Sequence, residues 1–285
     1  MINMQPCNLN NSFEEYKSAV KRKKPGPEKE ELQSIETPMQ ECYNNYKLHF
    51  DSNDLEHMQP AQVGRLHKNV LLEMYDSTNL IIRDFRKKFF DINRQTYNNL
   101  CPYCVINESN TTEHILPKEE YPEFSVDVLN LIPCCSKCNS LKGDTVLGID
   151  NNKLILNFYT DILPNLQFLF VDITAKDYIN FNYRLENVGN KIDANLFNLI
   201  ERHFTKLDLI NRYNQKAIQL FSEISNRYLA QDFKDEIEFD NFAKIQLKVW
   251  RNNNEFYGIN HWKQALERAC ATSPVFKHYI ISSLL

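Results

Sequence analysis

Residues 101–144 read CPYCVINESNTTEHILPKEEYPEFSVDVLNLIPCCSKCNSLKGD. Two Cys-x2-Cys pairs frame this stretch, and a Glu-His dipeptide and two spaced asparagines lie between or beside them. Thiolates at this spacing bind a metal, whereas carboxylate, amide and imidazole groups placed among them indicate a second ion with a catalytic duty. The stretch therefore predicts two metal sites within one short segment.

We assign the first site to a structural zinc, because two Cys-x2-Cys pairs on tight turns offer the four soft ligands of a tetrahedral ion. The expected ligands are Cys101, Cys104, Cys135 and Cys138. Cys134 could replace Cys135, although Cys134 and Cys138 would leave the less usual three-residue gap. The plain alternative is a set of buried cysteines without a metal.

The Cys-Pro-Tyr-Cys run alone resembles the redox pair of glutaredoxins. In that family the pair opens a helix near the start of a small domain. Here the pair begins at residue 101 and precedes a polar turn, and a second Cys-x2-Cys pair follows about thirty residues later. This arrangement favours metal binding over redox exchange.

Composition limits the remaining possibilities. The chain has 285 residues, 42% of them hydrophobic, and a net charge of -4, so it can bury a sizeable core as one large domain or two small ones. Residues 101–150 hold eight acidic and three basic residues, which places the acid excess on the motif. No apolar run approaches the roughly 18 to 20 residues of a membrane span, and the start lacks a secretory core, so we expect a cytoplasmic protein without a membrane partner. Five of the eight cysteines lie between positions 101 and 138, which fits metal thiolates better than disulfides.

Helices are predicted before the motif and strands after it. Up to about residue 33 the chain is a charged arm with one short helix over Ser12–Arg22. Residues 60–97 repeat apolar side chains at helical spacing, with a break at 77–79. After the motif, the alternating aromatic and aliphatic residues of LILNFY (154–159), LQFLFVDI (166–173) and YINFNYRL (178–185) predict the strands of a small sheet.

Helical spacing returns from Asp193, and Asp193 and Asp208 are expected to cap two helices. Two or three more helices are predicted to Leu285. We therefore predict an α+β, mainly helical fold in three parts. These are an N-terminal arm with helices (1–99), the motif (100–146), and a C-terminal region of short strands and then helices (147–285).

The motif resembles an HNH nuclease of the ββα-metal, or His-Me finger, group with four cysteines. Members read as Cys-x2-Cys, an acidic residue and His at a strand end, Asn in the next loop, then Cys-x2-Cys running into Asn or His on a helix. This sequence supplies Cys101, Cys104, Glu113, His114, Asn130, Cys135, Cys138 and Asn139 in that order. The resemblance implies a zinc-held ββα finger that hydrolyses phosphodiester bonds.

The same resemblance implies a role for each of the other positions. His114 is implied as the general base, because an imidazole with an ordinary pKa near 6.5 can take a proton from water. Glu113 and Asn139 are implied as oxygen ligands of Mg²⁺ or Mn²⁺, and Asn130 as the residue that holds the loop and orients the histidine. Adjacent strand residues point to opposite sides, so Glu113 and His114 require a twist, a bulge or a metal at the strand's end.

Basic residues supply the candidate contacts with nucleic acid. Lys142, one turn beyond Asn139, could reach a phosphate or be an ordinary solvated lysine. Two basic clusters have the same two interpretations: Lys21, Arg22, Lys23 and Lys24, and Arg86, Lys87 and Lys88. Such a finger has little surface for choosing a sequence, so specificity must come from flanking helices or a partner.

We therefore expect an endonuclease that nicks or cuts duplex DNA. An enzyme that cleaves RNA or tRNA would use the same site, and a zinc-stabilised binding module without catalysis would need only the cysteines. The layout around the finger is also similar, more weakly, to the nuclease subunit of Septu-type bacterial anti-phage systems. That resemblance implies a defence effector that works with a separate ATPase.

Overall fold

The computed structural model describes residues 1–7, 11–75, 80–93, 99–176 and 178–284. The chain forms two compact units. Asn3–Leu163, here named the finger unit, contains the cysteine motif, and Met1–Ile2 with Pro164–Leu285 forms the helical unit. Helices dominate and the strands form two two-stranded sheets, which confirms the predicted fold class. Among these residues no helix has the length and apolar character needed to cross a membrane.

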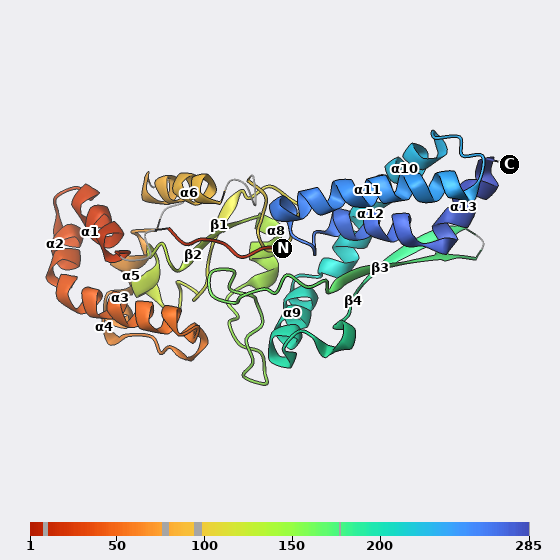
Figure 1. The fold of residues 1–285 in the computed structure, drawn as a ribbon. Coiled ribbons are helices and arrows are strands. Elements are labelled where there is room, and N and C mark those ends of the chain that lie inside the picture. The colour runs from red at the N-terminus through yellow and green to blue at the C-terminus, as the bar shows by residue number, and fades with distance from the viewer. Residues whose placement is uncertain (8–10, 76–79, 94–98, 177, 285) are drawn as a thin grey trace. The chain divides into compact units, whose positions relative to one another are not determined.

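The N-terminal part of the finger unit is a set of helices (Figure 1). They are α1 (Phe13–Arg22), α2 (Pro27–Ser34), α3 (Glu36–Asp51), η1 (Leu55–His57), α4 (Gln62–Leu66), α5 (Lys68–Leu72) and α6 (Leu80–Ile92). The helix predicted over Ser12–Arg22 is present as α1, whereas α3 was not predicted. The expected break at 77–79 lies outside the described residues.

The motif folds as two strands and a helix. β1 (Thr111–His114) pairs antiparallel with β2 (Leu131–Cys134), and α8 (Ser136–Lys142) follows β2 directly. The register is regular, with Glu113 opposite Ile132 and His114 opposite Leu131, so the ladder contains no bulge. His114 is therefore the last residue of its strand. Cys135 caps α8 because its sulfur accepts the N–H of Cys138 at 3.4 Å.

The loop between β1 and β2 packs against α3. It contains the short helix η2 (Pro122–Phe124), and the Phe124 ring lies 4.7 Å from the Tyr46 ring and 6.0 Å from that of Tyr43. All three side chains are buried. Burial of aromatic surface on both sides explains how a loop of this length keeps one conformation.

The prediction of a strand over LILNFY (154–159) is wrong. Leu156 and Phe158 are buried as their apolar character requires, but the backbone turns instead of extending. The carboxylate of Asp161 accepts the N–H of Asn157 at 2.7 Å, and the Asp161 N–H donates to the Asn157 carbonyl at 2.8 Å. This local pairing replaces the hydrogen bonds of a sheet.

The helical unit packs helices on one hairpin. β3 (Leu169–Ala175) and β4 (Ile179–Leu185) pair antiparallel, and the short helix η3 (Val188–Asn190) follows them. The remaining elements are α9 (Ala194–Lys206), α10 (Leu209–Leu229), α11 (Glu236–Tyr257), α12 (Trp262–Thr272) and α13 (Pro274–Leu284). The last two predicted strands and the C-terminal helices are therefore confirmed.

The two predicted caps have different outcomes. The Asp193 carboxylate accepts the N–H groups of Asn195 and Leu196, so it caps α9 as expected. Asp208 precedes α10 but adopts a left-handed backbone with φ of 52° and does not cap the helix through its side chain. Its carboxylate instead accepts the side-chain N–H of Asn211 at 3.0 Å, because α9 and α10 follow each other too closely for an extended cap residue.

Candidate active site

Four cysteine sulfurs converge in the finger unit. Cys101 and Cys104 come from the turn before β1, and Cys135 and Cys138 from the start of α8. Their sulfurs all lie within 4.8 Å of one another and the residues are buried. A tetrahedral zinc with bonds of about 2.3 Å has sulfur–sulfur edges of about 3.8 Å, and the Cys104–Cys135 separation is 3.9 Å. The donor set therefore fits zinc.

The choice between Cys134 and Cys135 follows from strand geometry. Cys134 is the last residue of β2, opposite Thr111, and its sulfur is not part of the cluster. Burial raises the pKa of the Cys134 thiol, as expected for an inert packed cysteine. Cys135 points to the cluster, where hydrogen bonds from the other thiols, Cys101 first, lower its pKa. The Asn107 amide also donates to its sulfur at 3.8 Å.

His114 lies at the end of β1 with its ring buried. Its Nε2 is 2.9 Å from the backbone carbonyl of Ser125. A carbonyl only accepts, so Nε2 carries the hydrogen and Nδ1 keeps its lone pair. Burial lowers the pKa of His114 to about 4, so the imidazole is neutral at pH 7. The ring is therefore held in the protonation state of a proton acceptor.

The segment around α5 fixes this imidazole from two directions. The Tyr75 ring meets the His114 ring edge-on at 4.5 Å, and the Tyr75 hydroxyl donates to the Thr112 carbonyl at 3.2 Å. The Ser125 hydroxyl donates to the Leu71 carbonyl at 2.8 Å, which anchors the carbonyl that holds Nε2. The sequence did not point to Tyr75 or Ser125, because neither belongs to a spaced motif and their contacts exist only in the folded chain.

Asn130 closes the loop that carries Ser125. Its Oδ1 accepts the N–H of Leu116 at 2.7 Å, and its Nδ2 donates to the carbonyls of Leu116 and Phe124 at 3.0 and 3.2 Å. The Tyr46 hydroxyl also donates to Oδ1 at 3.2 Å. Asn130 is fully buried and positions the backbone on both sides of the loop.

Glu113 points away from His114, toward α8. The Lys142 ammonium lies 2.8 Å from Glu113 Oε1 and also donates to the carbonyls of His114 at 2.9 Å and Gly143 at 3.4 Å. Burial raises the pKa of Glu113 more strongly than Lys142 lowers it. Lys142 is itself buried, so in this structure its ammonium holds β1 to α8 and does not extend toward a phosphate.

Asn139 lies on the same side of β1 as Glu113. Its Nδ2 donates to the Thr111 hydroxyl at 3.3 Å, and Thr111 and Glu113 share one face of the strand. Asn139 and Lys142, three residues apart, share one face of α8. The structure thus gathers Glu113, Asn139 and Lys142 between β1 and α8, while His114 faces the loop from the end of the strand.

Most cations of the two predicted basic clusters pair within the finger unit. The Arg86 guanidinium donates to the carbonyls of Ser109 and Thr111, so it braces α6 against the approach to β1. Arg22 and Lys88 face Asp84 and Glu15 at 3.8 and 3.3 Å. Lys23 pairs with Glu28 at 2.7 Å, and Lys21, Lys24 and Lys87 are exposed.

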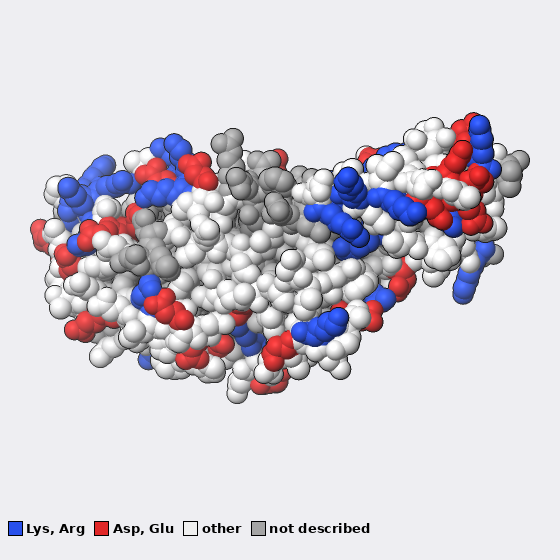
Figure 2. All heavy atoms as spheres, in the orientation of Figure 1, with Lys and Arg blue, Asp and Glu red and all other residues white. Residues whose placement is uncertain are grey.

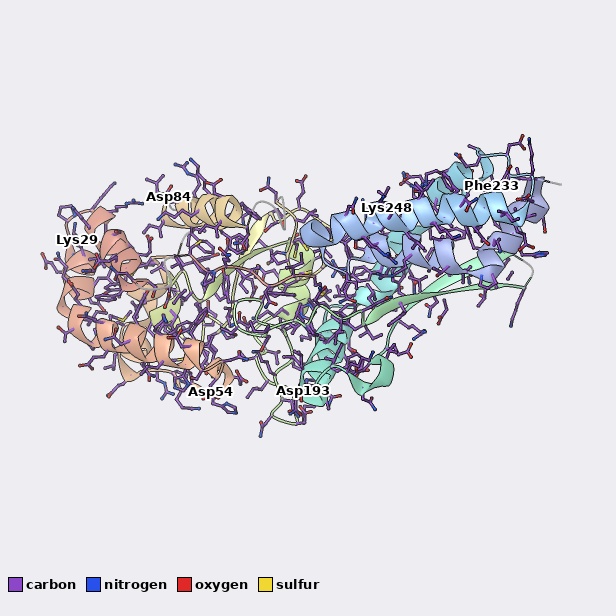
Figure 3. All side chains as sticks on the ribbon, viewed as in Figure 1. Lys29, Asp54, Asp84, Asp193, Phe233 and Lys248 are labelled. Atoms are coloured by element: carbon purple, nitrogen blue, oxygen red, sulfur yellow. The ribbon has the colours of Figure 1, made fainter. Side chains whose placement is uncertain are left out.

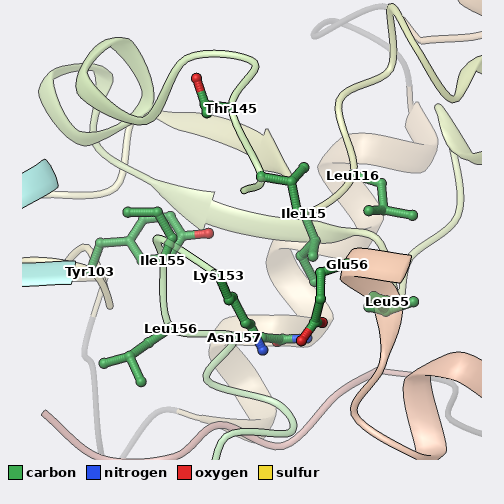
Figure 4. Close-up of a pocket in the computed structure, with 11 residues that line it drawn as sticks. Leu55, Glu56, Tyr103, Ile115, Leu116, Thr145, Lys153, Ile155, Leu156 and Asn157 are labelled. Carbon is green, nitrogen blue, oxygen red and sulfur yellow. The ribbon is translucent and has the colours of Figure 1, made fainter. Parts of the chain in front are cut away.

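A pocket beside the segment after β1 is separate from these groups (Figure 4). Its lining is largely apolar, with polar groups from Glu56, Lys153 and Asn157. The remaining lining residues are Leu55, Tyr103, Ile115, Leu116, Thr145, Val146, Ile155 and Leu156. Glu113, His114 and Asn139 do not line it, so the pocket is not the candidate reaction site.

Comparison with known proteins agrees with this geometry. Residues 101–145 match the family model of the HNH endonuclease. Protein ea31 of Escherichia phage lambda is 25% identical over 230 residues, 75% of each chain. Septu protein PtuB of Bacillus thuringiensis is 43% identical over 51 residues, which are 16% of this chain and 20% of that protein. No solved structure is significantly similar to the chain. With four converging cysteines and a strand–strand–helix finger at the matched residues, the chain contains an HNH endonuclease domain.

Proposed function

We propose that the chain is a metal-dependent endonuclease that hydrolyses phosphodiester bonds in DNA. The observation that carries the proposal is the state of His114. Its Nε2 is committed to the Ser125 carbonyl, which leaves Nδ1 with its lone pair as a proton acceptor. A binding module stabilised by zinc has no need for a histidine fixed in this way.

His114 acts as the general base in this proposal. Its lowered pKa keeps the ring neutral, so Nδ1 takes a proton from the attacking water, and the Ser125 carbonyl stabilises the imidazolium through Nε2. Tyr75 and Asn130 act as positioning residues for His114. Tyr75 contacts the His114 ring, and Asn130 holds the loop that carries the Ser125 carbonyl. The edge-on contact with the Tyr75 ring limits the rotation of the His114 ring.

Glu113 and Asn139 are the residues that would hold the catalytic ion. Only one carboxylate oxygen of Glu113 accepts from Lys142, and the Asn139 amide uses its nitrogen toward Thr111, so both side chains keep an oxygen. Oxygen donors suit Mg²⁺ or Mn²⁺, which when bound offsets the charge that develops on the phosphate. Lys142 compensates the Glu113 charge and fixes its orientation.

The test is cleavage by the purified chain. Duplex DNA, single-stranded DNA and tRNA are incubated with Mg²⁺ or Mn²⁺, beside the His114→Ala, Glu113→Ala and Asn139→Ala variants. We expect cleavage of duplex DNA by the parent and none by the variants, with zinc content unchanged. Cleavage of tRNA alone would show that the enzyme is an RNase. Full activity of His114→Ala would contradict the role of His114 as the general base.

We further propose a role in anti-phage defence with an ATPase as partner. The support is the 51-residue match to a protein named Septu protein PtuB. The match to a phage lambda protein over 230 residues carries no such role. Affinity purification of the tagged chain from its native host, followed by mass spectrometry, tests the partner. Recovery of the chain without an ATPase, together with unrestrained cleavage by the isolated protein, would contradict this role.

A further inference from the structure

One face of α11 carries three cations that form no ion pair with a side chain that the structure describes. Lys244, Lys248 and Arg251 follow one another at spacings of four and three residues, so they lie on the same side of the helix, and all three are exposed. None of them forms an ion pair with a residue that the structure describes. The sequence from 241 to 254 contains no Asp or Glu, so this part of α11 carries a local charge of +3.

The acidic first turns of α11 are neutralised separately. Lys277 of α13 lies 2.9 Å from Glu236 and 3.1 Å from Asp240. Elsewhere in the unit, Arg184 pairs with Asp172 at 2.8 Å, and Arg227 pairs with Glu267. Among the described residues, the fold therefore provides partners for these cations, while Lys244, Lys248 and Arg251 are exposed and form no ion pair. In Figure 2, Lys and Arg side chains gather over part of α11, and Figure 3 shows Lys248 directed away from the helix.

The cationic face of α11 is long enough to meet several phosphates of one strand. Seven residues of helix rise about 10.5 Å, and one strand of duplex DNA presents a phosphate about every 3.4 Å along its axis. The face therefore spans roughly three nucleotides. Ile245 and Val249 lie among the cations and are 59% and 47% exposed, so aliphatic side chains are available to contact the sugars.

We propose that this face of α11, Lys244, Ile245, Lys248, Val249 and Arg251, binds the sugar–phosphate backbone of the nucleic acid substrate. The inference rests on the proposed nuclease function and deepens it, because it assigns affinity to the helical unit. Protein interfaces are depleted of lysine at their centre, whereas two unpaired lysines and an arginine around a short aliphatic strip suit a polyanion. Contacts of this kind position a duplex and do not read its sequence.

The test compares two triple substitutions in the full-length chain carrying His114→Ala, so that binding is measured without cleavage. The first is Lys244→Gln, Lys248→Gln and Arg251→Gln. The matched control is Lys191→Gln, Lys216→Gln and Lys234→Gln, which removes three exposed charges from the same unit at dispersed positions. Affinity for a fluorescent 25-base-pair duplex is measured by anisotropy between about 50 and 200 mM salt.

We expect the α11 variant to bind at least tenfold more weakly at the lowest salt. The slope of log K against log salt should become shallower by about 2 to 3, since each backbone contact contributes about 0.9. The dispersed control should keep the parental slope. An equal loss of affinity in both variants would show that only the net charge of the chain matters, and it would overturn the inference. Binding of the α11 variant with the affinity of the parent would overturn it too.

A double substitution in the aliphatic strip distinguishes nucleic acid from a protein partner. Ile245→Ser with Val249→Ser should weaken duplex binding by less than the charge variant does. If these serines instead change the mass of the chain in light scattering, while the charge variant binds DNA normally, the face is a contact between copies and the inference fails. If the parent chain binds duplex DNA through α11 but does not cleave it, the proposed nuclease function is contradicted. The proposal that α11 binds the nucleic acid backbone would still hold.

Discussion

Replacement of Lys142 by methionine tests the buried ion pair between β1 and α8. The ammonium lies 2.8 Å from Glu113, and the two side chains are only 3% and 9% exposed. The substitution strands a carboxylate away from water and removes the donor to the carbonyls of His114 and Gly143. Breaking one side of a buried pair costs about 3–5 kcal/mol, so we expect the free energy of unfolding to fall by that amount.

The assay is urea unfolding followed by circular dichroism, with amide hydrogen exchange in β1 and α8 to locate the loss. The double variant Glu113→Leu with Lys142→Met removes both charges and should lie within about 2 kcal/mol of wild type, since apolar replacement of a buried pair is often neutral. Lys137→Met is the matched control. Lys137 is exposed on the same helix, and its change should stay within about 0.5 kcal/mol.

The loss in Lys142→Met should depend on pH. Burial raises the pKa of Glu113 and Lys142 opposes that shift, so the pKa rises further without the lysine. The folded state then keeps a proton that the unfolded chain releases near its ordinary pKa of about 4.3, and stability falls as pH rises above that value. The destabilisation should therefore be larger at pH 8 than at pH 5. Equal losses at both values, or a loss below about 1 kcal/mol, would refute this reasoning.

Three further predictions follow from the same geometry. Cys138→Ser should abolish zinc binding and unfold the finger, measured as zinc content and circular dichroism; a folded variant without zinc would show that the four-cysteine zinc site does not stabilise the finger. Asn130→Ala should lower the free energy of unfolding by about 3 kcal/mol, because it leaves buried backbone groups of the loop without partners, and a melting temperature like that of wild type would show that the loop does not depend on it. Tyr75→Phe should keep the cleavage rate within about threefold, whereas Tyr75→Ala should lower kcat about tenfold or more with little change in KM; equal rates would exclude a positioning role.

The site was predictable from sequence where its chemistry is local. The cysteines recur at fixed short spacings because turns must present them to one ion, and the structure resolves the choice between Cys134 and Cys135 by the alternation of β2. The hairpin over 169–185 was predictable because its apolar residues alternate. Tyr75 and Ser125 were not, since their contacts with His114 join segments 39 and 11 residues away that carry no shared pattern.

The wrong predictions share a physical cause. LILNFY has the composition of a strand and is buried, but the hydrogen bonds between Asn157 and Asp161 form a turn that no pattern of apolar residues reveals. Asp208 has the residue type of a cap, but the short connection from α9 forces its backbone into the left-handed region. In both cases a polar side chain selects a local partner, and composition does not say which one.

The basic residues of the chain also show that composition does not say where a side chain lies after folding. The clusters of consecutive cations at 21–24 and 86–88 are conspicuous in the sequence, but neighbouring residues of a helix point to different sides. In the folded chain Arg22, Lys23 and Lys88 pair with acidic side chains, and Arg86 donates to backbone carbonyls. Cations three and four residues apart are inconspicuous in the sequence but share a face. The proposal for α11 therefore rests on cations that are exposed and form no ion pair with a described residue, and not on the density of charge along the chain.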